Sequence, residues 1–255
     1  MKGFQLLFIL FLFMTIFSFI LIFIFSFGAA FIQRVSGFGF GIFIMTVLPY
    51  FLPTYGEATT LSGSLALITS AIIVSKMWHQ ILWKRLLPIL ITFLIVSFIA
   101  IQFVSSAADA TLKHLLGFVL IIASLWFLFF SNNINVRPTL LVQICMGTLS
   151  GAMGGLFGMQ GPPAVLYFLS CTNTKEQYIA LTQSFFLIGN IVMTIFRTRE
   201  GYFTQSVMIG WSCGIIAVLL GTWLGSKVFN KIPLNVLRYV IYLYMAVSGV
   251  IALLS

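Results

Sequence analysis

Glycine and proline are concentrated in residues 154–163, inside the longest uncharged run of the chain, which extends from Thr139 to Thr174. Four glycines and two prolines occupy these ten positions. They cannot continue a helix, because glycine loosens the backbone and proline lacks an N–H donor. Inside hydrocarbon, a broken backbone is tolerated only where protein buries it or where it lines a water-filled cavity. Free N–H groups at such a break can bind an anion, so the stretch is a candidate binding site.

A second glycine-rich break lies at residues 36–41. The two breaks align at an offset of 120 residues, and the same offset places Thr54 on Thr174. Two halves that each contain a broken segment in the corresponding position indicate the substrate site of a secondary transporter. We therefore predict two transmembrane repeats, residues 1–135 and 136–255, that together form one membrane domain.

The candidate site also includes part of the segment that follows the second break. Glu176, Gln183, Asn190 and Thr194 recur there at helical spacing and share one face, which either contacts the substrate or forms an interhelical hydrogen-bond seam. The aligned positions of the first half are mostly small: Gly56, Gly63, Ser70 and Val74. Arg34, beside the first break, either binds an anion or extends its charge to the membrane interface. The predicted substrate-binding residues are Gly37, Gly39, Phe40, Gly41, Gly158, Met159, Gln160, Gly161, Pro162, Gln183, Asn190 and Arg34.

The alignment of the two breaks predicts that valine has the same effect at corresponding glycines. Valine at Gly161 or Gly41 is expected to abolish transport, because a β-branched side chain fills the space where the backbone meets the substrate. Valine at Gly249, in the final segment and away from both breaks, is expected to leave the protein active. The glycines have an alternative role, since small residues also let helices pack closely in membranes.

The composition places the chain in a membrane. Hydrophobic residues make up 61% of the 255 residues and charged residues 7%, with a mean hydropathy of +1.15, which is outside the range of soluble domains. The 13 Lys and Arg residues outnumber the four Asp and Glu residues, but they lie singly at segment ends, so we predict no nucleic-acid partner. Three cysteines and two histidines without ligand spacing predict no metal site, and no cofactor is expected.

We predict an all-α, polytopic helical membrane protein whose halves are inverted repeats, each with one short broken segment. If each half crosses the membrane five times, both termini lie outside, and eight Lys or Arg residues lie inside against three outside. Those eight are Arg34, Lys76, Lys84, Arg85, Arg137, Lys175, Lys227 and Lys231. If the short segments are re-entrant, each half crosses four times and the distribution is seven against four. The five-crossing arrangement is favoured, and it places Tyr202, between Arg197 and Thr204, in an external loop.

The two glycine motifs resemble the twin signatures of the TauE/SafE family. They are residues 37–41 with a proline eight positions later, and residues 158–163 followed by the apolar residues 164–169. The typical motif has glycine where this chain has Phe40 and Gln160. The family comprises bacterial inner-membrane permeases described as sulfite-exporter-like. The resemblance therefore implies a multi-pass protein of the bacterial inner (plasma) membrane that transports a small sulfur-containing or organic anion.

The leading functional hypothesis is a secondary transporter, a permease or exporter. It would bind a small anion, such as a sulfur-containing oxyanion or an organosulfonate, at the two helix breaks near the bilayer midplane. An ion or solute channel is the alternative. An intramembrane enzyme would need a nucleophile with a base, paired carboxylates or a metal cluster, and no such motif is present, so no catalytic residue is predicted. The expected partners are the small anion and the lipid bilayer, and a homodimer is one open assembly state.

Overall fold

A computed structural model describes residues 2–130, 138–229 and 234–254 of the chain. Within these ranges every regular element is a helix. The helices are α1 (Lys2–Ser36), α2 (Phe40–Ile44), α3 (Tyr55–Met77), α4 (Trp83–Ser106), α5 (Asp109–Phe130), α6 (Leu140–Phe157), α7 (Gly161–Cys171), α8 (Lys175–Arg199), α9 (Gln205–Val228) and α10 (Leu234–Leu254), with short 3-10 turns at Leu48–Tyr50 and Trp78–Gln80. In this described part, six helices are long and apolar enough to cross a membrane. The predicted all-α, polytopic membrane fold is confirmed.

Matching threonines start the two helices that follow the breaks. The Thr54 hydroxyl accepts a hydrogen bond from the Glu57 N–H at the start of α3, and the Thr174 hydroxyl accepts one from the Gln177 N–H at the start of α8, each at 3.2 Å. Such a cap satisfies one of the N–H groups that a helix leaves free at its beginning. The aligned threonines thus have the same structural role.

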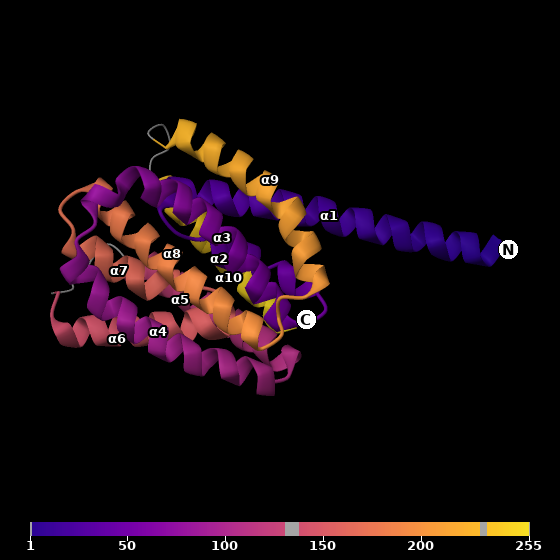
Figure 1. The fold of residues 1–255 in the computed structure, drawn as a ribbon, viewed down its shortest axis with the longest axis horizontal. Coiled ribbons are helices and arrows are strands. Elements are labelled where there is room, and N and C mark those ends of the chain that lie inside the picture. Colours follow the sequence, from indigo (N-terminus) through magenta and orange to yellow (C-terminus); the bar gives the residue numbers. More distant parts are fainter. Residues whose placement is uncertain (1, 131–137, 230–233, 255) are drawn as a thin grey trace.

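The long helices pack in pairs that join the first half of the chain to the second. α1 lies along α9, α4 along α6, α3 along α8 and α5 along α10. In Figure 1 the α1 and α9 pair borders one side of the bundle and the α4 and α6 pair the opposite side, with α3 and α8 between them. The N-terminal part of α1 projects beyond the other helices.

Glycine contacts show that α4 and α6 run parallel. Gly147 lies against Ile89, and Gly155 lies against Ala100, so residue numbers rise together along the two helices. A Cβ atom at Gly147 would approach the Ile89 carbonyl oxygen to 2.7 Å, which means that the two backbones are in contact. α1 and α9 run parallel in the same way, through the pairs Ser26 with Gly214 and Arg34 with Gly225. Close helix packing, the alternative role of glycine, therefore applies to these two pairs.

α3 and α8 run antiparallel through the centre of the bundle. Gly63 lies beside Asn190, whereas Ser70, later in α3, donates a hydrogen bond to Gln183, earlier in α8, at 3.0 Å. α4 runs parallel to α8, since Phe93 contacts Phe185 and Phe98 contacts Phe196. α3 runs parallel to α9, since Leu61 contacts Gly210 and Thr69 contacts Thr222. Consequently α1, α3 and α9 run one way, and α4, α6 and α8 run the other way.

Charge divides the bundle into two ends. The antiparallel packing of α3 and α8 brings Lys76 and Lys175 to one end, where the ammonium of Lys175 and the guanidinium of Arg34 both lie over the Phe229 ring. We call this the basic end. The opposite end, here the mixed end, contains three of the four acidic residues: Glu57, Asp109 and Glu200. A re-entrant arrangement was expected to separate Lys76 from Lys175, whereas the two lysines lie at the same end of the bundle.

The orientation predicts opposite labelling of cysteines at the two ends. In a variant without the three native cysteines, a cysteine at exposed Glu200 should react with an impermeant thiol reagent in intact cells. A cysteine at exposed Asn173 should react only after lysis, because the basic end is expected to face the cytoplasm. Tyr202 is a poorer reporter, since its ring packs against Gly56. Labelling of both positions in intact cells would contradict the helix directions, and the reverse pattern would show the opposite orientation.

Candidate binding site

The second glycine break turns the chain from α6 into α7. Gly158 adopts the left-handed conformation (φ 67°), and its N–H donates to the Gly154 carbonyl at 3.0 Å, which ends α6. α7 then begins at Gly161 with two prolines in its first turn, where their missing N–H groups leave no hydrogen bond unmade. α7 runs back along α6, because the Gln143 amide donates to the Tyr167 hydroxyl at 2.6 Å.

The first glycine break has the same function between α1 and α2. Gly37 (φ 85°) and Gly39 (φ 101°) both occupy left-handed conformations that other residues rarely adopt. The Ser36 hydroxyl secures the turn by donating to the Phe38 carbonyl at 2.6 Å. α2 starts so close to the second break that a Cβ atom on Gly41 would collide with the Gly158 carbonyl oxygen. The breaks of the two halves therefore touch backbone to backbone.

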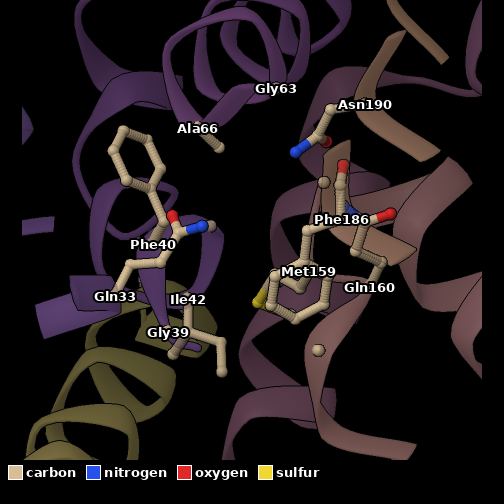
Figure 2. A pocket seen from close by; sticks show the side chains of 13 residues that line it. Gln33, Gly39, Phe40, Ile42, Gly63, Ala66, Met159, Gln160, Phe186 and Asn190 are labelled. Atoms are coloured by element: carbon tan, nitrogen blue, oxygen red, sulfur yellow. The ribbon is translucent and has the colours of Figure 1, made fainter. Parts of the chain in front are cut away.

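A cavity of about 30 Å³ lies where the two breaks meet. It has room for one or two water molecules. Its lining residues are Gln33, Gly39, Phe40, Gly41, Ile42, Gly63, Ala66, Gly158, Met159, Gln160, Gly161, Phe186 and Asn190. Figure 2 shows Gln33 and Phe40 on one side of the cavity, Met159 and Gln160 on the other, and Asn190 beside Gly63. Phe186 and Asn190 lie near the middle of α8, so the cavity is close to the middle of the membrane.

Three buried amides give the cavity its polar character. Gln33, Gln160 and Asn190 are 1%, 6% and 4% exposed. The Oε1 atoms of Gln33 and Gln160 have no hydrogen-bond partner within the described chain. Buried amides are normally satisfied, so these groups are available to a water molecule or a ligand. An amide can present either an N–H or an oxygen by rotation, so it can donate to an anion.

The lining contains no charged side chain. Over the described ranges, no group of three or more His, Cys, Asp or Glu residues is placed to hold a metal ion. The chemistry available at the cavity is therefore hydrogen bonding by amides and by the backbone around the breaks. Such groups can bind and release a solute, but they do not transfer protons or form covalent intermediates.

Eight of the twelve predicted binding residues line the cavity: Gly39, Phe40, Gly41, Gly158, Met159, Gln160, Gly161 and Asn190. Gln183 lies one layer toward the basic end, where its amide donates to the Gly37 carbonyl at 2.7 Å and accepts from Gln33 and Ser70. Gln183 and Gly37 therefore do not line the cavity. Together with Gln33 and Ser70 they form a hydrogen-bonded polar seam on its basic-end side.

The other two predicted residues lie farther away. Arg34 donates from Nε to the Ser226 hydroxyl at 2.8 Å at the basic end, so it does not line the cavity. Pro162 lines an apolar recess of about 280 Å³ between α5, α6 and α7. The other five lining residues were not among the predicted binding residues: Gln33, Ile42, Gly63, Ala66 and Phe186. Gln33 had a usable signal, since it is a polar residue that ends the long apolar run before the first break.

Arg197 was expected to be a loop charge outside the membrane, and this expectation is wrong. Its side chain is 1% exposed and is the largest of the fully buried side chains among the described residues. Its guanidinium donates from Nη1 to the Thr59 carbonyl at 3.1 Å, and from Nη2 to the carbonyls of Gly154 and Gly155 at 2.8 and 3.3 Å. Spacing could not reveal this, because a charge near a segment end is normally solvated.

The expectations for glycine substitution need revision at two positions. A Cβ atom at Gly249 would lie 2.8 Å from the Gly117 carbonyl oxygen, so the idea that Gly249 tolerates valine is wrong. The expected equivalence of Gly41 and Gly161 is also wrong in steric terms. A Cβ at Gly41 collides with backbone, whereas a Cβ at Gly161 meets nothing nearer than the Phe186 ring at 3.5 Å. Of these two positions, Gly161 is therefore the one that tests the cavity without a collision with backbone.

The two broken segments, α2 and α7, differ in the contacts that hold them in place. The Tyr244 ring of α10 stacks on the Phe43 ring of α2 at 4.6 Å, and the Tyr244 hydroxyl donates to the Phe43 carbonyl at 3.2 Å. Thr46, just after α2, also bonds to the Tyr244 hydroxyl. The first turns of α7 instead border the apolar recess described above. On that side, which faces away from the cavity, no aromatic ring of a described residue stacks on them.

The comparisons with known proteins agree with this arrangement of two broken segments within a helical membrane bundle. The profile of the family described as sulfite exporter TauE/SafE matches residues 22–251, which include both breaks and the whole cavity lining. No curated protein and no solved structure matches the chain. Since the family profile covers nearly the entire sequence, the chain belongs to the TauE/SafE sulfite exporter family.

Proposed function

We propose that this protein is a secondary transporter that binds a small anion in the cavity between the two breaks and exchanges it across a bacterial inner membrane. Membership in the TauE/SafE family implies a membrane transporter with a small solute as substrate. The substrate class we favour is a sulfur-containing oxyanion or an organosulfonate. The observation that carries the proposal is the convergence of both broken segments on one polar cavity halfway along α8.

Transport by alternating access requires that the cavity can be closed from each side in turn. The cavity is small, and packed contacts bound it on both sides along α8. Toward the basic end lies the seam of Gln33, Ser70 and Gln183, and toward the mixed end lies the guanidinium of Arg197. A small cavity with packed contacts on both sides favours a transporter over an open channel.

The helix pairing supports the two proposed repeats, residues 1–135 and 136–255. α1, α3 and α4 occupy the same places in the first half as α6, α8 and α9 in the second, and each runs opposite to its counterpart. The pairing of α1 with α9 has its equivalent in the pairing of α6 with α4. This is the pattern that an inverted repeat produces, and such repeats place the substrate at their shared interface.

Neutral donors suit the proposed substrate. α7 begins at the cavity with Gly161, and the N-terminus of a helix carries a partial positive charge. The amides of Gln160 and Asn190 can add hydrogen bonds to an oxyanion. Donors of this kind can bind the oxygens of an anion through hydrogen bonds.

Substitution of Gly161 tests the binding site. In proteoliposomes, the wild-type protein should exchange external labelled sulfite for internal sulfite with saturable kinetics. Gly161→Val should abolish this counterflow while expression and unfolding temperature stay normal, because the Cβ position at Gly161 has no contact nearer than 3.5 Å and Gly161 lines the cavity. Gln160→Ala should weaken affinity roughly several-fold, as expected for one hydrogen bond of about 0.5–1.5 kcal/mol.

A matched control is Ala110→Val, at an exposed position in the first turn of α5. It adds the same kind of bulk far from the cavity and should transport like the wild type. If Gly161→Val also transports at the wild-type rate, the cavity is not the substrate site. Flux that does not saturate and shows no exchange would instead favour a channel.

The polar seam on the basic-end side of the cavity provides a second prediction. Gln183→Ala removes the partner of the Gly37 carbonyl and one of the two acceptors of the Gln33 amide, the other being Ser70, which leaves buried polar groups unpaired at about 1–3 kcal/mol each. A cysteine at Ala66, in the cavity lining, should then react faster with a thiol reagent added to the basic end. Equal acceleration from both ends would indicate general loosening instead of opening toward the basic end. Gln205→Ala, at an exposed position, is the control.

A further inference from the structure

Arg197 is a buried cation without an anionic partner. Its three hydrogen bonds go to neutral backbone carbonyls, those of Thr59, Gly154 and Gly155. The ionisable groups near it are the phenols of Tyr55 and Tyr202, and over the described ranges no carboxylate pairs with it. Burial raises the pKa of the Tyr202 phenol, so that phenol stays neutral. The positive charge is therefore not cancelled within the described structure.

A structural role explains part of this arrangement. The carbonyls of Gly154 and Gly155 lie near the end of α6, where a helix carries a partial negative charge, and the Gly154 carbonyl also accepts the Gly158 N–H. A guanidinium satisfies those acceptors well. However, a full charge inside a membrane protein is costly, and such residues usually face a substrate or ion pathway. A neutral donor could have capped α6, so the charge itself requires a further reason.

The bare backbone of Gly63 leaves room for one carbon atom beside Arg197, Asn190 and Thr194. A Cβ atom at Gly63 would lie 3.4 Å from Nη1 of Arg197, 3.5 Å from Oδ1 of Asn190 and 3.8 Å from Oγ1 of Thr194. Gly63 and Asn190 also line the cavity, so this position borders the cavity. Nη1 has two N–H groups and donates one hydrogen bond, to Thr59. The Thr194 hydroxyl is buried and has no partner within the described chain.

We propose that Arg197, Asn190 and Thr194 form an anion-binding position over the bare backbone of Gly63, at the mixed-end side of the cavity. The inference rests on the proposed transport function and deepens it. The negative charge of a small oxyanion is bound by Arg197, while its remaining oxygens accept hydrogen bonds from the neutral donors of the cavity. On the basic-end side, the equivalent layer of Gln33, Ser70 and Gln183 is uncharged. Arg197 is thus the residue that selects anions over neutral solutes of the same shape.

Charge selectivity tests this assignment. Counterflow of labelled sulfite is measured in competition with methanesulfonate, which is an anion, and with dimethyl sulfone, which is neutral and similar in shape. The wild type should prefer methanesulfonate strongly. Arg197→Gln should lose that preference and bind sulfite roughly ten- to a hundred-fold more weakly, as expected for hydrogen bonds to a charged group. Arg197→Lys should retain the preference, and Arg199→Gln, an exposed neighbour at the same end, should behave like the wild type.

Each outcome has a distinct meaning. If the wild type exchanges none of the tested anions, the proposed transport function fails. If it exchanges sulfite and Arg197→Gln still prefers methanesulfonate to dimethyl sulfone, the role of Arg197 fails alone. A cap without a binding role would lower all affinities by the same factor and leave the preference unchanged.

Gly63→Ala gives an independent test if Arg197→Gln does not fold. The added Cβ has ordinary contacts of 3.4 Å or more, and alanine is a better helix former than glycine, so the unfolding temperature should be equal or higher. The methyl group nevertheless fills the proposed position, and the apparent affinity for sulfite should fall roughly tenfold or more. Ser75→Ala, at an exposed position of α3, is the control. A stable Gly63→Ala variant with unchanged affinity would overturn the proposal.

Discussion

The arrangement at the centre of the bundle follows from one constraint: every backbone polar group away from water needs a hydrogen-bond partner. Each break interrupts a helix and leaves N–H and C=O groups that hydrocarbon cannot solvate. The structure buries the two breaks against each other, with Gly41 packed on the Gly158 carbonyl. Side chains from the second half take up free carbonyls, Gln183 at Gly37 and Arg197 at the end of α6. The groups that complete the backbone hydrogen bonding therefore lie beside the cavity, so the proposed binding site is a consequence of how the breaks are stabilised.

Glycine has two separate roles in this arrangement. At Gly37, Gly39 and Gly158 it permits left-handed backbone, which ends one helix and starts the next. Along α4 with α6 and α1 with α9, helical glycines allow parallel helices to approach until backbones touch. The second role provides a rigid frame on both sides of the bundle, and α3 and α8 cross between these frames. A short motif of glycines cannot distinguish the two roles by itself, because both depend on the absence of a side chain.

Much of the fold was predictable from the sequence because the bilayer restricts the possible structures. Apolar runs of sufficient length must be helices, and prolines with glycines must break them, so the helical fold and the positions of both breaks followed directly. The contribution of Asn190 to the cavity followed from helical spacing. Gln33 and Arg197 were missed because the position of a polar residue near the end of a span does not show whether it faces water, lipid or another helix. The close contact at Gly249 was missed for a related reason, since sequence periodicity does not show which helices are neighbours.

The unequal support of the two broken segments has a mechanical consequence. Displacing α2 would separate the stacked rings of Phe43 and Tyr244 and break the hydrogen bond from the Tyr244 hydroxyl. α7 is held differently, since its first turns border the apolar recess and its hydrogen bond to α6, from the Gln143 amide to the Tyr167 hydroxyl, lies toward its other end. Although the halves resemble each other in plan, the wall of the cavity formed by the first break is anchored to α10 beside the cavity, and the wall formed by the second break is anchored to α6 at a distance from it.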